Sequence, residues 1–375
     1  MSQETNKLQR KAVARRALLA AGASAAPAWI AAGSAPAAAQ ARHDWTMVTS
    51  WPKGAPGPGT TADRIARRLT ALSGGRLSVK LFAAGELVPA LEVFDAVAGD
   101  VAQIGHSASF FWAGKLEASA FFTAIPFGLT PDAHNAWLYE GGGQALWDEL
   151  YADAGLKPFA AGNSGMQMGG WYKRELKALD DLKGLKLRMP GLGGEVVRRL
   201  GVTAVNLAPG EILPALQSGA IDGAEFLGPW SDQALGFYKA APYYYWPGFH
   251  EPNGSAECLI NRAAFEALPD DLRELVATVC EAENLRGLAE ADWQNALSLE
   301  SLERERGVKL RRYPDAILAA AYEATDEVLA ERAGRDALAG RIHRSYQEAR
   351  RRALAWARVA RHAVLDTELR LAAGD

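Results

Sequence analysis

The sequence is poor in residues that bind transition metals. Among its 375 residues are two cysteines and six histidines, and neither type recurs at the short spacings that hold zinc. These counts exclude a zinc or redox-metal centre. Cys258 lies in a strand-like run and Cys280 in a helix-like run. Their separation in space does not follow from the sequence, so a disulfide between them stays open.

An excess of basic residues is also missing once the N-terminal region is set aside. The formal net charge of the whole chain is −3, and residues 1–41 hold five basic residues and one acidic residue, so the remainder has a net charge of −7. Nucleic-acid partners require basic groups that neutralise phosphates. We therefore expect no nucleic acid among the partners.

Residues 1–41 have the composition of an export signal. A basic region is followed by the alanine-rich stretch ALLAAGASAAPAWIAAG, and Ala39-Gln40-Ala41 fits a small-x-small cleavage site. We predict cleavage near Ala41. The pair Arg15-Arg16 suggests the twin-arginine route, although the usual polar flanks are missing. The alternative is an N-terminal membrane anchor, which the short, alanine-rich run disfavours.

Strand-like and helix-like segments alternate along the rest of the chain. Strands are predicted near residues 44–51, 76–85, 101–108, 156–162, 168–173, 185–189, 203–207, 221–226, 258–262 and 308–313. Helices are predicted between them, with a long helix from Asp270 and only helix after Pro314. This alternation predicts an α/β fold with parallel sheets. The order favours two lobes joined by several crossing segments over two consecutive domains.

Two enzyme motifs are incomplete. The run Gly105-His106-Ser107-Ala108-Ser109 resembles a nucleophile elbow but lacks the closing glycine. The run GLGGEV at residues 191–196 lacks the third glycine of a dinucleotide site at its place. Neither motif therefore supports a hydrolase or a dinucleotide-binding protein.

Four polar residues stand at the ends of predicted strands in apolar or glycine-rich surroundings: Gln167, Arg188, Glu225 and Glu251. Taken alone, Arg188 fits a phosphate site, a carboxylate clamp or an ordinary surface charge. An arginine offers a planar fork to a carboxylate. Two carboxylates would repel an anionic ligand unless a hard cation, which prefers oxygen ligands, lay between them. Nearby aromatic residues could form the apolar walls of a small-ligand cleft; these are Trp171, Phe226, Trp230 and Phe249.

Two longer stretches carry a family resemblance. The run LRMPGLGGEVVRRLGVTAVNLAPGEILPALQSGAIDGAEFLGPWSD and the later run KAAPYYYWPGFHEPNG resemble the solute-binding proteins of tripartite ATP-independent periplasmic (TRAP) transporters. The similarity is greatest to the branch that binds 2-oxo monocarboxylates. Looser similarity extends from TSWPKG and HSASFFWAGK to CLINRAAFEALP, and so covers nearly all of the chain after residue 41.

The resemblance implies roles for single residues. Arg188 would pair with the ligand carboxylate, and Gln167 would meet both ligand and cation. Glu225, Glu251 and the backbone oxygen of Phe226 would complete the cation site, with Na⁺ favoured and Ca²⁺ the alternative. The family usually has tryptophan where Phe226 stands, and tyrosines where Phe110 and Phe111 stand. Phe226 and Phe111 would still contact the ligand, but the lost polar groups put its side chain in doubt.

The resemblance also implies the architecture. It implies a periplasmic binding-protein fold of two α/β lobes with a cleft between them, a long helix spanning both lobes and a long C-terminal helix. We expect the first lobe at residues 42–165 with about 254–313, the second at 166–253, and a C-terminal helical segment at 314–375. Within this segment we predict a helix over about 340–371. Its small residues at four- and three-residue steps fit packing on its own lobe, or dimerisation as in this branch.

We therefore predict a periplasmic binding protein, not an enzyme. It would capture a small 2-oxo or 2-hydroxy monocarboxylate and deliver it to the small and large membrane subunits of a TRAP permease. Two alternatives stay open. One is a periplasmic enzyme acting on an organic acid with Glu251 or His250 as base, and the other is a sensor domain that presents the ligand to a receptor.

Overall fold

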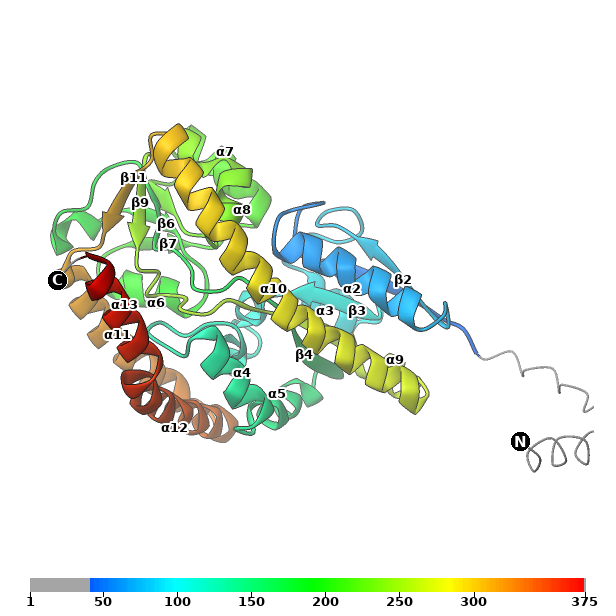
Figure 1. The fold of residues 1–375 in the computed structure, drawn as a ribbon. Helices are drawn as coiled ribbons and strands as arrows, with labels where there is room; N and C mark the ends of the chain where they lie inside the picture. The colour runs from blue at the N-terminus through cyan, green and yellow to red at the C-terminus, as the bar shows by residue number, and fades with distance from the viewer. Residues whose placement is uncertain (1–40, 374–375) are drawn as a thin grey trace, which may run out of the picture. The chain divides into compact units, whose positions relative to one another are not determined.

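The computed structural model describes residues 41–373. The predicted export signal lies outside the described residues, apart from Ala41. Among residues 41–373, no helix combines the length and the apolar character needed to span a membrane. The mixed α/β architecture is confirmed, and Figure 1 shows its strands in two groups with helices around them.

The first sheet has five strands in the order β2-β1-β3-β10-β4. Their bounds are β1 His43–Thr49, β2 Leu77–Phe82, β3 Ile104–Ser107, β4 Leu156–Asn163 and β10 Ser255–Asn261. Strands β2, β1 and β3 are parallel, but β10 is antiparallel to both β3 and β4. The expectation of parallel sheets is therefore wrong for this part of the fold, because β10 returns to the sheet after the chain has built the second lobe.

The second sheet has six strands in the order β11-β9-β5-β8-β6-β7. Their bounds are β5 Gly170–Tyr172, β6 Lys186–Arg188, β7 Thr203–Val205, β8 Gly223–Ala224, β9 Tyr243–Trp246 and β11 Lys309–Arg312. Strand β5 is antiparallel to its neighbours, and the other pairs are parallel. Strand β9, a run of three tyrosines and a tryptophan, was not predicted from the sequence.

One predicted boundary needs correction. The expected first lobe, residues 42–165 with about 254–313, includes the strand predicted near residue 310. Strand β11 instead pairs with β9 at the edge of the second sheet, in register from Lys309 with Tyr243 to Arg312 with Trp246. The remaining lobe bounds stay predictions.

The helices pack around both sheets. They are α2 (Pro58–Leu72), α3 (Val93–Ala98), α4 (Pro131–Tyr139), α5 (Gly143–Ala152), α6 (Gly191–Arg199), α7 (Ile212–Ser218), α8 (Pro229–Leu235), α9 (Arg262–Glu266), α10 (Asp270–Glu305), α11 (Asp315–Ala333), α12 (Ala337–Val359) and α13 (Arg361–Ala373). Five short 3₁₀ helices lie at Ser109–Trp112, Glu117–Phe122, Leu179–Leu182, Pro209–Glu211 and Phe237–Lys239.

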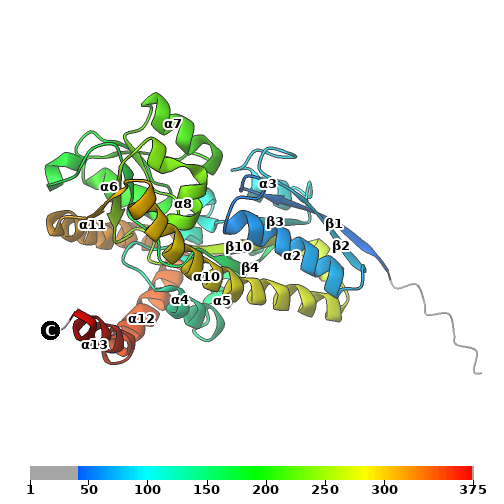
Figure 2. The same cartoon turned by 45° about the horizontal axis from the view of Figure 1, so that its top comes forward.

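Helix α10 is the predicted helix that spans both lobes. It has 36 residues and runs from the region of α2 and β4 to that of α8 (Figures 1 and 2). In its first half, the buried Glu283 accepts hydrogen bonds from Arg64 and Arg68 of α2 at 2.8 and 2.7 Å. Further along, the side-chain oxygen of Asn295 accepts from the backbone N–H of Trp230 in α8 at 3.0 Å. Polar contacts thus tie one rigid element to both halves of the fold.

The C-terminal segment is helical, as expected, but the helix predicted over about 340–371 is divided. Helix α12 ends at Val359 and α13 begins at Arg361, because Ala360 has ψ of −92° and leaves the helical region. One face of α12 packs on its own chain. There, the Tyr346 hydroxyl accepts from the backbone N–H of Leu129 at 2.8 Å, and Trp137 donates to Ser345 at 3.0 Å.

The two cysteines are free thiols in the structure. Both are fully buried, Cys258 in β10 and Cys280 in α10. Burial raises the pKa of the Cys258 thiol well above its usual range, which keeps it protonated. The structure therefore contains no disulfide between Cys258 and Cys280.

Candidate functional site

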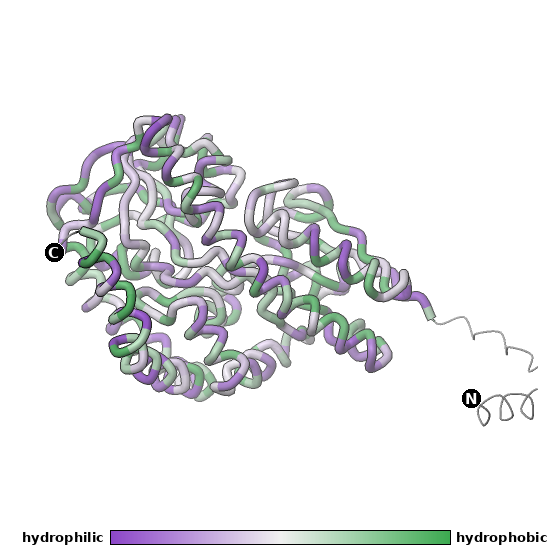
Figure 3. The backbone as a smooth tube through the Cα atoms, in the orientation of Figure 1, coloured by the Kyte–Doolittle hydropathy of each residue, from purple (hydrophilic) through white to green (hydrophobic). Residues whose placement is uncertain are grey.

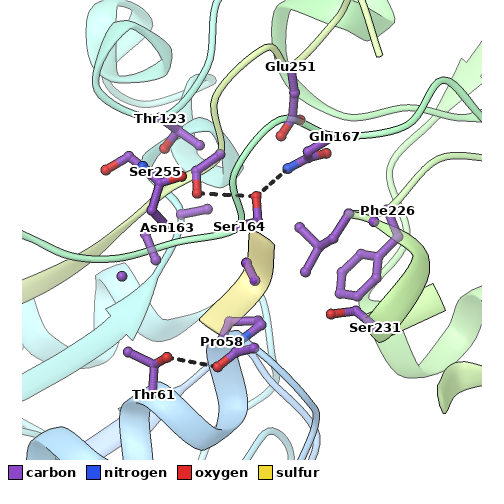
Figure 4. A pocket seen from close by; sticks show the side chains of 18 of the residues that line it. Pro58, Thr61, Thr123, Asn163, Ser164, Gln167, Phe226, Ser231, Glu251 and Ser255 are labelled. Carbon is purple, nitrogen blue, oxygen red and sulfur yellow. Dashed lines mark hydrogen bonds between the residues drawn. The ribbon is translucent and has the colours of Figure 1, made fainter. Parts of the chain in front are cut away.

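A cavity lies between residues that belong to the two sheets and to α10. In Figure 4, Thr123, Asn163 and Ser255 lie on one side, while Phe226 and Ser231 lie on the other. Helix α10 adds Ala291 and Asn295 to the wall. The cavity is partly open to solvent and is lined mainly by apolar and uncharged polar residues, as small-ligand sites in proteins commonly are.

Arg188 reaches this cavity from the carboxyl end of β6. Its Nη1 donates to a carboxylate oxygen of Glu225 at 2.6 Å and to the backbone oxygen of Glu225 at 2.7 Å. Its Nε donates to the backbone oxygen of Leu207 at 3.3 Å. Among the described residues, none accepts from Nη2. The guanidinium is therefore fixed on one side and keeps donor capacity for a ligand on the other.

Strand pairing explains why Arg188 and Glu225 meet. In the parallel pair of β6 and β8, Arg188 is in register with Ala224, and the backbone N–H of Glu225 donates to the carbonyl of Arg188 at 3.1 Å. The two side chains therefore leave neighbouring strands at the same edge. Ligand sites of α/β proteins commonly lie at the carboxyl ends of such strands.

The glycines after Arg188 allow the chain itself to pack closely. A Cβ at Gly193, in the first turn of α6, would lie 2.9 Å from the Cβ of His250. This distance is shorter than the normal contact between two non-bonded carbon atoms. Helix α6 therefore packs against the loop that carries His250 and Glu251. The glycines serve this packing, which positions two residues of the site.

Glu225, His250 and Glu251 form a buried cluster. One ligand atom from each lies within 4.8 Å of the others. His250 Nε2 lies 2.9 Å from the second carboxylate oxygen of Glu225. Burial raises the pKa of the Glu251 carboxyl well above its usual range, and the negative charge of Glu225 raises it further. Two carboxylates this close are stable together only if one is protonated or a positive charge lies near both.

Gln167 lies beside this cluster. Its backbone N–H donates to the carbonyl of Glu251 at 3.3 Å, and its side-chain nitrogen donates to Ser164 at 2.9 Å. Its side-chain oxygen is buried and has no hydrogen-bond partner. A hard cation takes amide and carboxylate oxygens as ligands. The unpartnered amide oxygen beside two buried carboxylates therefore fits such an ion.

The structure thus brings together the four polar residues named from the sequence. Gln167, Arg188 and Glu251 line the cavity, and Glu225 contacts Arg188 directly behind them. Phe226 also lines the cavity, with its ring centroid 5.8 Å from the Arg188 guanidinium carbon. Such a contact between a cation and an aromatic ring is attractive.

The expected aromatic walls are only partly right. Phe226 and Trp230 line the cavity, as do Trp51, Phe110 and Phe111. Trp171 does not, because it is fully buried and stacks on Tyr244 with ring centroids 3.9 Å apart. Phe249 is also buried elsewhere, against Phe127 at 5.3 Å.

Asp232 is a supporting residue that the sequence analysis did not single out. It is buried in α8 and accepts hydrogen bonds from Trp171 at 2.9 Å, Tyr244 at 2.8 Å and the backbone N–H of Leu227 at 3.2 Å. Burial raises the pKa of Asp232 to about 7, while these hydrogen bonds favour the charged form. The residue holds the turn after Phe226 against the second sheet.

His250 entered the sequence analysis only as a possible base. The structure places it at hydrogen-bond distance from Glu225, and it is 1% exposed. Its position next to Glu251 in the run FHEPNG was the available signal. Asn163, Ser164 and Ser255 also line the cavity and were missed, because nothing in their local sequence distinguishes them from ordinary loop residues.

Residues 47–336 match the family described as bacterial extracellular solute-binding protein, family 7. The chain belongs to this family. The resemblance recognised in the sequence is thereby confirmed, as are the α/β fold of two lobes and the function of a TRAP solute-binding protein.

A curated relative is 43% identical over 317 residues, which cover 84% of this chain and 86% of the relative. It is named the monocarboxylate 2-oxoacid-binding periplasmic protein and comes from a Nostoc species.

Solved structures show the same fold. A TRAP transporter solute-binding protein from Bordetella bronchiseptica, described as a mixed-occupancy dimer with copurified calcium and picolinate, is 36% identical with a TM-score of 0.87. The alignment covers 89% of this chain and 99% of that one. A protein from Pseudoalteromonas atlantica with bound sodium and pyruvate is 35% identical with a TM-score of 0.84. The alignment covers 87% of this chain and 99% of that one.

A third structure, from Colwellia psychrerythraea, holds calcium and pyruvate. Its identity is 35%, its TM-score is 0.84 and its coverage is 87% of this chain and 99% of that one. These neighbours thus hold sodium or calcium together with a small carboxylate.

Proposed function

We propose that this protein captures a small 2-oxo or 2-hydroxy monocarboxylate in the cavity between its lobes and delivers it to the membrane subunits of a TRAP permease. The observation that supports this most directly is the position of Arg188. Arg188 is 1% exposed and lines the cavity, Glu225 holds its guanidinium, and none of the described residues accepts from its Nη2. A buried arginine of this kind is suited to a carboxylate.

The cation would be held by side-chain oxygens of Gln167, Glu225 and Glu251 and by the backbone oxygen of Phe226. When bound, such an ion supplies positive charge and accepts ligand oxygens. We propose sodium or calcium, the ions that the solved relatives hold. The protein residues orient the ligand: Arg188 binds its carboxylate, and Phe226 and Phe111 flank its carbon chain.

Closure of the cavity strengthens these contacts. The Ser231 hydroxyl of α8 donates to the backbone oxygen of Pro56, next to α2, at 3.0 Å, so residues of both lobes touch at the edge of the cavity. A charge pair becomes stronger when water is excluded from it. A ligand that contacts both lobes would favour their closed arrangement over an open one.

Calorimetric titration of the purified protein tests this function. We expect pyruvate and related 2-oxo monocarboxylates to bind with a stoichiometry of about one in the presence of Na⁺ or Ca²⁺. Exhaustive dialysis against a chelator and a sodium-free buffer should weaken binding by at least about tenfold, because two buried carboxylates are then left near the ligand. The bound acid should be recovered unchanged. Turnover of the acid would instead support the enzyme alternative, and affinity that is unchanged after dialysis would contradict the cation site.

We also propose a homodimer formed through the C-terminal helices. A groove between α4 and α12 is lined by Ala133, Ala349, Ala353 and Trp356, among others. Large apolar side chains on α12 and α13 are exposed, Trp356 and Leu369 each by 71%, and Figure 3 shows apolar stretches along α13. Exposed apolar patches of this kind mark interaction sites. The dimeric relative from B. bronchiseptica suggests a second copy as the occupant.

Native mass spectrometry of the protein exported from cells checks both assembly and processing. We expect a dimer whose subunits have lost residues 1–41, as periplasmic export with cleavage near Ala41 requires. A monomer at all concentrations would contradict the dimer. Subunits of full-length mass would contradict the export signal.

A further inference from the structure

One hydroxyl in the cavity has no partner. Eight buried side-chain atoms of the described residues lack a hydrogen-bond partner. Only two of them belong to residues that line the cavity: the amide oxygen of Gln167 and the hydroxyl oxygen of Ser255. The Gln167 oxygen is assigned to the cation site. Ser255 is 1% exposed, and an unpaired buried hydroxyl is unfavourable enough to require an explanation.

The backbone around Ser255 is built to face the cavity. Ser255 is the first residue of β10 and pairs with Asn163 of β4, whereas Glu257 pairs with Ala160, so β4 has one additional residue in this interval. The extra residue is accommodated by Gly162, whose φ is +146°, and a Cβ there would lie 3.2 Å from Thr61. Bulges of this kind redirect side chains at the ends of strands.

The polar groups around Ser255 are already engaged. The Asn163 side-chain nitrogen donates to Asn253 at 2.8 Å, and Asn253 donates to the carbonyl of Thr123 at 2.8 Å. The Thr123 hydroxyl oxygen accepts from the backbone N–H of Ser109 at 2.9 Å. None of these groups forms a hydrogen bond with the Ser255 hydroxyl. The backbone N–H of Ser255 donates to the backbone oxygen of Thr123 at 3.3 Å. The buried hydroxyl therefore keeps its hydrogen-bonding capacity unused by the described residues.

Ser255 and Arg188 come from different lobes. Ser255 belongs to the first sheet and Arg188 to the second, and both line the same cavity. The charged residues among the lining residues of the described chain are Arg188 and Glu251, and both belong to the carboxylate and cation end. A group that reaches Ser255 therefore meets hydroxyl and amide side chains such as Thr123 and Asn163, which suit a neutral polar group.

We propose that the ligand carries, besides its carboxylate, a neutral hydrogen-bonding group on its side chain that bonds to the Ser255 hydroxyl. The ligand class is thus a 2-oxo or 2-hydroxy monocarboxylate with a hydroxyl, carbonyl or amide group on a short chain. The carboxylate and the adjacent oxygen suffice for Arg188 and the cation, and the side-chain group contacts the first lobe. This inference rests on the proposed function for the carboxylate end.

Matched pairs of acids test the inference by calorimetry. The probes are 2-oxopropanoate, 2-oxobutanoate and 2-oxopentanoate, each with and without a terminal hydroxyl, at saturating Ca²⁺ and separately at saturating Na⁺. In the wild-type protein at least one hydroxylated acid should bind about tenfold or more tightly than its plain partner, since a buried hydroxyl then gains its missing bond. Ser255→Ala should abolish this advantage while binding the plain acids within about threefold of wild type.

Thr61→Val is the matched control. Thr61 lines the same cavity, but its hydroxyl already donates to the backbone oxygen of Gly57 at 2.8 Å. The preference for the hydroxylated acid should survive this change. Equal binding of every pair by the wild-type protein would overturn the inference, and so would an equal loss of both members of each pair in Ser255→Ala. Failure of every acid to bind with either cation would instead overturn the proposed function, and the inference with it.

Discussion

Replacement of Arg188 by methionine should weaken binding of the carboxylate by at least about 100-fold, which corresponds to roughly 3 kcal/mol. Methionine fills a similar volume but has no donor for the carboxylate. The ligand would then bring a negative charge into a site that already contains Glu225 and Glu251. Calorimetric titration with pyruvate measures the change directly.

Two further variants make the result specific. Arg188→Lys keeps the positive charge but not the planar fork, so its affinity should lie between those of the wild type and Arg188→Met. Arg199→Met removes an arginine of α6 that pairs with Glu327 at 2.9 Å on the surface and does not line the cavity, and should leave binding unchanged. If Arg188→Met bound pyruvate as tightly as the wild type, the role assigned to Arg188 would be wrong. Thermal denaturation of each variant shows whether its fold is intact.

Replacement of Glu225 by glutamine should lower the free energy of unfolding of the ligand-free protein by about 3 kcal/mol. The Arg188 side chain is 2% exposed and that of Glu225 is fully buried, with 2.6 Å between the paired atoms. Without the carboxylate, the guanidinium keeps backbone oxygens as acceptors but loses its closest negative charge. Removing one partner of a buried pair costs far more than removing a surface charge. Urea denaturation in the absence of ligand measures this effect.

Glu251→Gln is the informative counterpart of Glu225→Gln. Both changes remove one carboxylate from the same cluster with almost no change in shape. Because burial and the nearby Glu225 raise the pKa of Glu251, its charged form is already unfavourable in the ligand-free protein. Glu251→Gln should therefore cost less than about 1 kcal/mol of stability, or stabilise the protein slightly, while it weakens the response of ligand binding to Na⁺ or Ca²⁺. Equal destabilisation by the two variants would contradict this division of roles.

The contrast between these two glutamates shows how the site is organised. Glu225 is anchored twice, by Arg188 and by His250, and is therefore part of the structure before any ligand arrives. Among the described residues, none forms an ion pair with Glu251 and none bonds to the side-chain oxygen of Gln167 beside it. The part of the site around Arg188, which we assign to the carboxylate, is thus preorganised by the protein, whereas the part around Glu251 and Gln167, which we assign to the cation, is left electrostatically incomplete. Preorganised contacts bind a ligand at a lower entropic cost.

Much of the fold could be predicted from local patterns. The alternation of apolar strands and amphipathic helices predicted the α/β class, ten of the strands and the long helix from Asp270. Strand β9 escaped because three tyrosines and a tryptophan have no alternation of apolar and polar residues, and Tyr244 and Tyr245, on opposite faces, are both buried. The break at Ala360 also escaped, since alanine favours the helix and gives no signal of its end.

The candidate site was predictable only in part. Arg188, Glu225 and Gln167 stood out as polar residues at predicted strand ends, and all three, like Glu251, lie in motifs shared with a known family. Ser255 and Asp232 carry no such signal. Their roles depend on which backbone groups lie opposite them, and these come from segments far away in the sequence. Trp171 and Phe249 failed as wall residues for the same reason, because local sequence does not show which side of a strand or loop faces a cavity.

The sequence by itself determined the class of the fold and the family. The class follows from residue types and short spacings, which are properties of the chain before it folds, and the family follows from the long stretches that resemble its members. Only the tertiary structure decided that β10 and β11 belong to different sheets, that Glu225 is the partner of Arg188, and that the hydroxyl of Ser255 is unpaired. Such facts depend on hydrogen bonds between segments distant in the chain, and these form only when strands pair in one register and bury their side chains together.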